Sequence, residues 1–185
     1  ADALETFVGD YGIGLIGGCC GTTPEHLAAV VEKMSSKPFK DRGAAIDPGA
    51  SSLYQYVPFR QDNTYLAIGE KTNANGSRAF RDALVNEDWE KCVEIARDQI
   101  RDGAHMLDLS VDYVGRDGAK DMYEIASRFA TASTLPIVLD STEPNVIKAG
   151  LEALGGRCVI NSVNYEDGDG PTSRFARIMP LVKEH

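Results

Sequence analysis

The stretch PIVLDSTEPNVIKAGLEALGGRCVINSV, residues 136–163, contains the pattern that decides the fold of this chain. A short apolar run ends in Asp140 and is followed by a helical pattern over 143–156, in which apolar residues recur at three- and four-residue spacing. A second apolar run follows and carries Asn161. Strand, helix and strand in this order predict a βαβ unit, whose two strands lie parallel in one sheet with a right-handed crossover.

The same alternation extends upstream of this unit. We expect short strands at 65–69, 105–111, 136–140 and 157–163, separated by helices at 86–103, 118–133 and 143–156. Gly103 is expected to end the first of these helices. The pattern predicts an α/β fold, and four such strands fit either an open doubly wound sheet or half of a (β/α)8 barrel. Cys92 and Cys158 fall on apolar faces and are expected to be buried and unreactive.

Polar residues lie at or near the carboxyl end of each expected strand. The first runs into a loop that begins at Glu70, the second contains Asp108, and the last two carry Asp140 and Asn161. Ligands of parallel α/β folds bind at the carboxyl ends of the strands, although turns and helix caps use the same residue types. A carboxylate beside a carboxamide suits a flat heterocycle with adjacent N–H donors and a carbonyl acceptor.

The stretch GGCCGTTPEHL, residues 17–27, places Cys19 and Cys20 side by side between glycines. We expect a strand and turn before the pair, and a helix after it that starts at Thr23-Pro24 and ends near residue 35. Three interpretations of the pair stay open: a strained disulfide, buried inert thiols, or two thiolate ligands of a metal, zinc first. Two thiolates do not complete a tetrahedral zinc site, so further ligands would lie elsewhere.

Residues 36–62 lack this periodicity and contain scattered prolines and aromatic residues. Because so long a patternless stretch is unusual inside one compact unit, we expect an inter-domain linker whose Tyr54, Tyr56 and Phe59 pack on a neighbouring surface. A disordered tether is the alternative. Residues 1–35 and 63–185 are then expected to belong to two different domains.

Composition excludes several classes of function. The formal net charge of -9 argues against a surface for nucleic acid or anionic membranes. We see no apolar run of the roughly 18 residues that a membrane span needs, and no signal peptide, and therefore expect a cytoplasmic protein with reduced thiols. The four cysteines and three histidines form no catalytic triad pattern, and no phosphate-binding glycine loop is present.

Together these motifs resemble the cobalamin-dependent methionine synthases (5-methyltetrahydrofolate–homocysteine methyltransferases) over nearly the whole chain. The matching stretches are GGCCGTTP, IGEKTNANGSRAF, AHMLDLSVD, PIVLDS and CVINSVN. Lys71 stands where the family usually has Arg. The resemblance implies that 1–35 is the last βα unit of a homocysteine-binding barrel, that 36–62 is the linker, and that 63–185 is the first half of a pterin-binding barrel.

The resemblance also assigns residues. It implies that Cys19 and Cys20 are two of three zinc ligands, that Asp140 is the pterin-ring carboxylate and that Asn161 is the pterin-binding amide. It places further folate-binding residues at Glu70, Asn73, Asn75, Gly76, Ser77, Arg78 and Asp108.

The implied activity is methyl transfer from 5-methyltetrahydrofolate, through cobalamin on a domain outside this sequence, to zinc-bound homocysteine, which yields methionine and tetrahydrofolate. The alternatives are a stand-alone pterin-binding enzyme, such as a corrinoid methyltransferase or a dihydropteroate-synthase-like protein, and a non-catalytic α/β module. We expect the chain to be a segment of a longer protein. Alone it would be inactive, would pair with the remaining domains of the parent chain, and could self-associate through open sheet edges.

Overall fold

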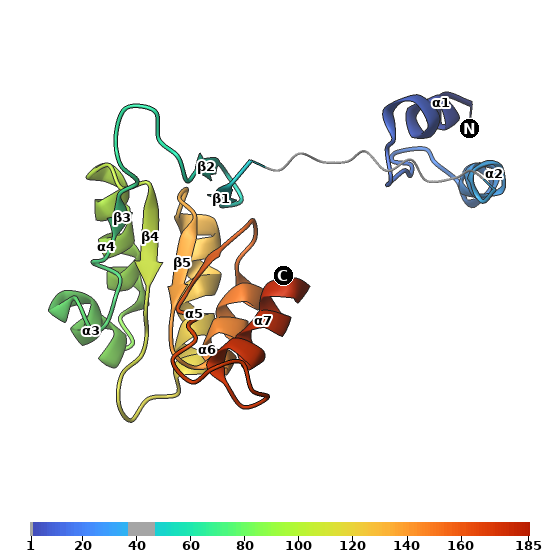
Figure 1. Ribbon diagram of the computed structural model, residues 1–185. Coiled ribbons are helices and arrows are strands. Elements are labelled where there is room, and N and C mark those ends of the chain that lie inside the picture. Colours follow the sequence, from blue (N-terminus) through green and yellow to red (C-terminus); the bar gives the residue numbers. More distant parts are fainter. Residues whose placement is uncertain (1, 37–46) are drawn as a thin grey trace. The chain divides into compact units, whose positions relative to one another are not determined.

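The computed structural model describes residues 2–36 and 47–185, and the chain divides into two compact units at the boundary between Ile46 and Asp47 (Figure 1). Over residues 2–36 the regular structure of the smaller unit is helical, and the larger unit contains a four-stranded and a two-stranded sheet. Within the described ranges, no helix has the length and apolar character that crossing a bilayer requires.

The smaller unit consists of helices α1 (Asp2–Tyr11) and α2 (Pro24–Met34). Helix α2 begins and ends as predicted, and the backbone N–H of Thr23 donates to Nδ1 of His26 (3.1 Å) at its start. The predicted strand and turn before the cysteines is wrong, since its first residues lie in α1 and the rest form no strand. A strand needs a neighbouring strand to satisfy its backbone groups, and the described part of this unit offers none, whereas a helix satisfies its own.

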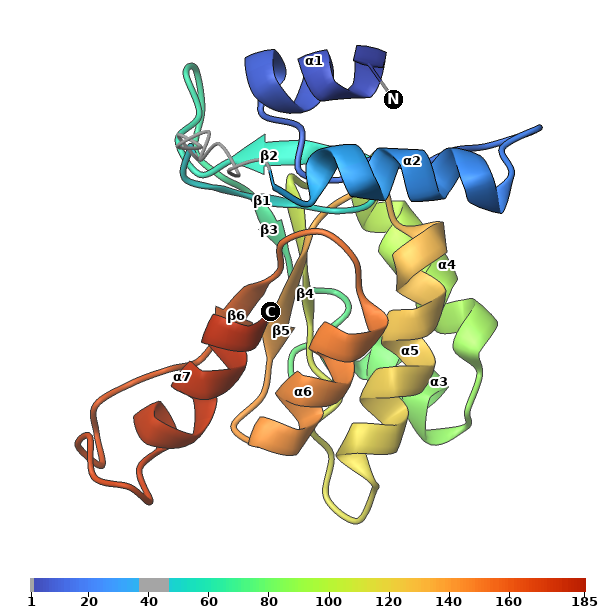
Figure 2. The ribbon, with the colours of Figure 1, turned by 90° about the vertical axis from the view of Figure 1, so that its right-hand side faces the viewer.

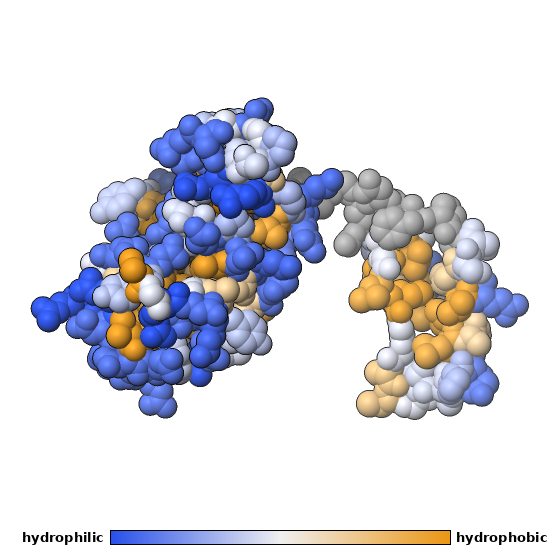
Figure 3. All heavy atoms as spheres, turned by 90° about the horizontal axis from the view of Figure 1, so that it is seen from below, coloured by the Kyte–Doolittle hydropathy of each residue, from blue (hydrophilic) through white to orange (hydrophobic). Residues whose placement is uncertain are grey.

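Apolar side chains remain on the surface of the smaller unit (Figure 3). No residue of α1 or α2 is buried, and Leu15 and Val31 are 91% and 65% exposed. Lys33 pairs with Asp2 and with Glu5 (2.7 Å to Glu5) and so connects the two helices. The described residues of this unit therefore do not enclose a hydrophobic core of their own.

The larger unit is built on a parallel sheet with the strand order β3-β4-β5-β6. The strands are β3 (Ile68–Gly69), β4 (Met106–Leu109), β5 (Ile137–Asp140) and β6 (Val159–Asn161), all within the predicted ranges. Chain order and spatial order coincide, as in a barrel, whereas a doubly wound sheet reverses its order at a switch point. The α/β fold with a parallel sheet is confirmed, and the strands that the structure describes do not close into a barrel.

Helices cover one face of this sheet, as Figure 2 shows for α4, α5 and α6. The helices are α3 (Arg78–Val85), α4 (Trp89–Arg101), α5 (Gly118–Ala132), α6 (Pro144–Ala153) and α7 (Arg174–Glu184). The predictions for α4, α5 and α6 are confirmed, and Gly103 follows α4 with a φ of 90°. Sequence analysis missed α3, which is short and begins where the hydroxyl of Ser77 accepts from the backbone N–H of Phe80 (3.3 Å).

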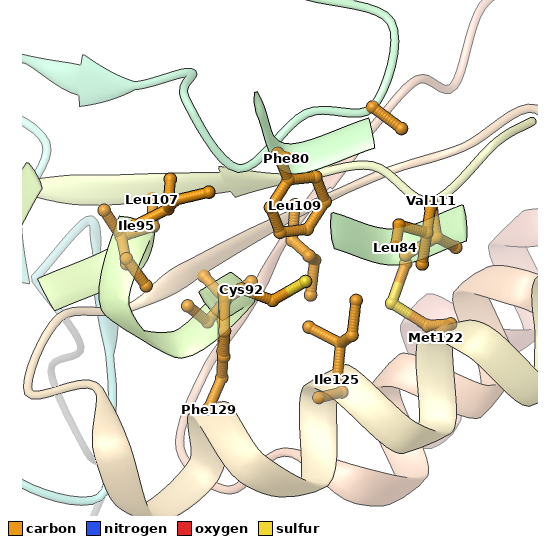
Figure 4. Close-up of a cluster of buried hydrophobic side chains, with 14 of the residues drawn as sticks. Phe80, Leu84, Cys92, Ile95, Leu107, Leu109, Val111, Met122, Ile125 and Phe129 are labelled. Carbon is orange, nitrogen blue, oxygen red and sulfur yellow. The ribbon is translucent and has the colours of Figure 1, made fainter. Parts of the chain in front are cut away.

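The main hydrophobic core lies between the sheet and these helices (Figure 4). Leu107 and Leu109 of β4 pack there with side chains such as Phe129 of α5. Cys92 belongs to this core and is fully buried, which raises the pKa of its thiol to about 12. Burial raises the pKa of the Cys158 thiol to about 11. The predicted burial is confirmed for Cys92, and Cys158 is half-buried against the same core.

A hairpin covers part of the opposite face of the sheet. Strands β1 (Gly49–Ser51) and β2 (Tyr56–Pro58) pair antiparallel, and their buried residues pack with Met106 and Val138. Ser51 and Arg157 exchange backbone hydrogen bonds of 3.0 and 2.8 Å, beside Gly156, where a Cβ would lie only 2.2 Å from the Ser51 carbonyl oxygen. This part of the predicted linker is thus ordered structure rather than a patternless tether.

The aromatic residues of the predicted linker only partly cover the large unit. Tyr54, Tyr56 and Phe59 are 57%, 49% and 43% exposed, and the Tyr54 hydroxyl donates to the Thr131 carbonyl oxygen (3.1 Å). Residues 37–46 of the predicted linker lie outside the described residues.

Candidate functional site

The face of the sheet opposite the helices is apolar at its amino end and polar at its carboxyl end. Strand alternation places Met106 and Asp108 on this face of β4, and Val138 and Asp140 on the same face of β5. The β3–α3 loop brings Asn73 against this polar layer. Three segments far apart in the sequence therefore contribute to one cluster.

Asn73 joins the two carboxylates of this cluster. Its Nδ2 donates to Oδ2 of Asp108 (2.8 Å) and to Oδ2 of Asp140 (2.9 Å). Its Oδ1 accepts from the backbone N–H groups of Asn75 (2.9 Å) and Gly76 (3.1 Å). Because these backbone donors fix which end of the amide is oxygen, both hydrogens of the amide nitrogen are directed at the two carboxylates.

The surroundings of Asp108 and Asp140 raise the pKa of both carboxyl groups above its ordinary value. Burial is the main reason that the pKa of Asp108 is raised, and the charges of Asp140 and Glu70 add to it, while the bond from Asn73 opposes it. The pKa of Asp140 is raised by burial and by the charges of Asp112 and Glu70, again against the bond from Asn73. Two partly desolvated carboxylates with one shared donor have spare capacity to accept N–H groups from a ligand.

The other predicted folate residues occupy different positions around this cluster. Asn161 pairs in register with Asp140 on the neighbouring strand and is exposed. Glu70 is exposed and acts on the cluster through its charge. Ser77 caps α3, and the exposed Arg78 contacts Asp82 (3.5 Å). The structure therefore brings Asn73, Asn75, Gly76, Asp108 and Asp140 into one hydrogen-bonded group, with Asn161 beside it, whereas the printed contacts of Ser77 and Arg78 belong to the start of α3.

A groove of about 680 Å³ adjoins this group. It lies between the loops that follow β4 and β5, and its lining includes Asn75, Asp112, Tyr113 and Thr142. Asp112 accepts from the Ser141 hydroxyl (2.9 Å) and so ties the two loops together. The resemblance assigned neither Asp112 nor Tyr113 to the folate site, although a position just beyond a strand end is a signal for including them.

Cys19 and Cys20 lie in a turn that leads into α2. The backbone N–H of Thr22 donates to the Cys19 carbonyl oxygen (2.9 Å), and Gly21 has a φ of 82°. Both thiols are free and exposed, which argues against the disulfide and the buried-thiol interpretations. Within residues 2–36 and 47–185, no three His, Cys, Asp or Glu side chains gather as a metal site. Two exposed thiolates of this kind can contribute to a four-coordinate metal site but do not complete one.

Two family models match separate parts of the chain. A family model for pterin binding enzymes matches residues 69–185, and one for homocysteine S-methyltransferases matches residues 1–34. The chain is 60% identical to the methionine synthase of Mycobacterium tuberculosis over 185 residues and 58% identical to that of Mycobacterium leprae over 190 residues. Each match covers 100% of this chain and 16% of the relative. The resemblance to methionine synthase is thus confirmed, and the chain belongs to the pterin-binding enzyme family.

Proposed function

We propose that this chain contributes the folate-binding site of a cobalamin-dependent methionine synthase, together with two zinc ligands of its homocysteine site. The overall reaction moves the N5-methyl group of 5-methyltetrahydrofolate to the sulfur of homocysteine, while the thiol proton is balanced by a proton gained at N5. The observation that carries the proposal is the group formed by Asn73, Asp108 and Asp140. It lies within the residues that the pterin-binding family model matches.

The chemistry of this group suits the pterin ring. One edge of a pterin presents neighbouring N–H donors and a carbonyl oxygen. Asp140 is only partly buried, so its carboxylate can accept two such N–H groups, and the exposed amide of Asn161 beside it can both donate and accept. Asp108 is 6% exposed, and we assign it the deeper end of the ring. These residues would hold and orient the substrate and would make no covalent bond to it.

The cysteine pair fits part of a zinc site. Cys19 and Cys20 would hold the metal together with a further protein ligand outside the described residues. When bound, zinc would lower the pKa of the homocysteine thiol, so that the sulfur is a thiolate near neutral pH. The match of residues 1–34 to homocysteine S-methyltransferases supports this assignment and weighs against a stand-alone pterin-binding enzyme.

Other parts of the proposal reach beyond this chain. Cobalamin would supply the methyl-carrying chemistry, and we assign no described residue to its binding. Further strands would complete the (β/α)8 barrel that the sequential order β3-β4-β5-β6 begins, and they would cover the open edges through which an isolated sheet self-associates. We propose a cytoplasmic location.

The test is methyl transfer by the intact protein supplied with cobalamin. We expect methionine to form from labelled 5-methyltetrahydrofolate and homocysteine, and we expect Cys20→Ser to lose both bound zinc and this activity. Asp98→Asn changes an exposed carboxylate whose contact is Arg101, and it should leave the rate unchanged. No labelled methionine from the wild-type protein, or full zinc content in Cys20→Ser, would contradict the assignment.

A further inference from the structure

A buried hydrogen-bond chain lies directly beneath the Asn73 group. Gln99 reaches it from helix α4 and is 3% exposed, and Thr72 is fully buried. The Gln99 Oε1 accepts from the backbone N–H of Lys71 (2.6 Å), and its Nε2 donates to the Thr72 hydroxyl (3.2 Å). That hydroxyl in turn donates to the backbone carbonyl of Asp108 (2.5 Å). The chain therefore runs from α4 through the β3–α3 loop to β4.

This chain fixes the two residues that precede Asn73. Gln99 holds Lys71 and Thr72 through separate atoms of one amide, so neither can shift without losing a buried hydrogen bond. On the other side of Asn73, the backbone N–H of Ala74 donates to the Ser110 carbonyl oxygen (2.9 Å). Asn73 is thus held from both sides, and its amide has little freedom to leave the carboxylates.

The backbone of β3 leaves room for this arrangement. A Cβ placed on Gly69 would lie 2.6 Å from the Gln99 Oε1. A side chain at residue 69 would therefore displace the end of Gln99 from the Lys71 N–H. The absence of a side chain at Gly69 is one condition for the hydrogen bond that starts the chain.

We propose that Gln99 and Thr72 are positioning residues for the folate site, which set Asn73 between Asp108 and Asp140 and thereby aim both carboxylates at the ligand. The proposal rests on the proposed pterin-binding function. Neither side chain touches the ligand, because both are buried beneath the polar layer. Their effect reaches the ligand through the Asn73 amide.

The expected consequence separates positioning from general structural support. If Asn73 loses its place, Asp108 and Asp140 lose the hydrogen bond that lowers their pKa, while burial and the charges of Glu70 and Asp112 continue to raise it. Ligand N–H groups need ionised carboxylates. As the pH is lowered, a variant that misplaces Asn73 should therefore begin to lose affinity for a folate at a higher pH than the wild-type protein does. Its affinity should also be weaker at neutral pH.

The test is calorimetric binding of 5-methyltetrahydrofolate to the intact protein between pH 5 and pH 8. Thr72→Val keeps the shape of the side chain but removes its hydroxyl, and it should weaken binding about tenfold, the equivalent of one hydrogen bond of roughly 1.4 kcal/mol. It should also move the affinity loss to higher pH. Thr72→Ser keeps the hydroxyl and should bind within about twofold of the wild-type protein.

The outcomes distinguish this proposal from the function on which it rests. A wild-type protein that does not bind the folate would overturn the proposed function. Wild-type binding together with unchanged affinity and pH dependence in Thr72→Val would overturn the positioning proposal alone. If Thr72→Val does not fold, Gln99→Met is the replacement variant, because it removes both side-chain hydrogen bonds of Gln99 at similar volume. Unchanged folate binding in Gln99→Met would likewise overturn the positioning proposal.

Discussion

Replacing Asn73 by Asp tests whether this amide bridges the carboxylates of Asp108 and Asp140. The change is nearly isosteric, but it puts a carboxylate oxygen in place of the nitrogen that lies 2.8 Å from Asp108 and 2.9 Å from Asp140. At an effective dielectric constant of about 20, two unit charges at such a separation repel by about 6 kcal/mol. Protonating an aspartate with an ordinary pKa of about 3.9 at pH 7 costs about 4 kcal/mol. The variant should therefore bind one additional proton in the folded state at neutral pH.

The additional proton makes the stability of the variant depend on pH. The folded variant holds this proton and the unfolded chain releases it above pH ~4, so the carboxyl pKa is raised on folding and stability falls as pH rises. Relative to the wild-type protein, Asn73→Asp should lose about 2.7 kcal/mol more at pH 7 than at pH 5, which is one proton over two pH units. In the wild-type protein the pKa values of Asp108 and Asp140 are also raised. The quantity to compare is therefore the difference in unfolding free energy between the variant and the wild-type protein at each pH.

Pulse proteolysis in urea measures the unfolding free energy of the larger unit in the intact protein, provided that peptides from residues 78–161 are followed by mass spectrometry. Asn73→Ser is the matched control, because it removes the same hydrogen bonds without adding a charge and should change much less with pH. An Asn73→Asp variant whose loss of stability is equal at pH 5 and pH 7 would refute the assigned contacts between Asn73 and the carboxylates.

Two further predictions concern the packing of the larger unit. Asp121 is 3% exposed at its side chain and accepts two bonds (2.5 and 2.8 Å) from Arg116, whose side chain is 19% exposed. Asp121→Ala should therefore destabilise this unit by about 3 kcal/mol in the same proteolysis assay, and a loss below about 1 kcal/mol would contradict the ion pair. Gly156→Ala should displace the β1–β2 hairpin, because its φ is 86° and the new Cβ would meet the Ser51 carbonyl oxygen; hydrogen exchange at the Ser51 N–H should become faster, and unchanged protection would disprove the close approach.

Sequence patterns predicted the elements that repeat. From residue 65 onward the strands were predicted from short apolar runs, and the helices between them from apolar residues that recur at a spacing of about 3.6. Asp108 and Asp140 could be placed at one edge of the sheet because parallel strands end together. The hydrogen bonds that connect the two carboxylates through Asn73 could not be predicted, because they depend on how the β3–α3 loop folds back onto β4.

The errors have different physical origins. The residues before Cys19 were predicted as a strand from their apolar run, but a strand forms only where a partner strand is present, and the described smaller unit has none. The β1–β2 hairpin was missed although its pairing is local, because each of its strands has three residues and they contain Gly49 and Pro58, which are poor strand formers. Sequence analysis did not single out Gln99, whose part in the site follows from its burial and its hydrogen bond to Thr72.

The most direct test of the account is the affinity of the intact protein for 5-methyltetrahydrofolate, measured by calorimetry for the wild-type protein, Asp140→Asn and Asp98→Asn. The Asp140→Asn substitution keeps the size of the side chain but removes the charge that would accept the pterin N–H groups. We predict that it weakens binding at least tenfold, since a hydrogen bond to a charged group contributes about 1.5–3 kcal/mol, while the exposed Asp98→Asn control binds as the wild-type protein does. Equal affinity of Asp140→Asn and the wild-type protein would contradict the central claim that this carboxylate binds the pterin.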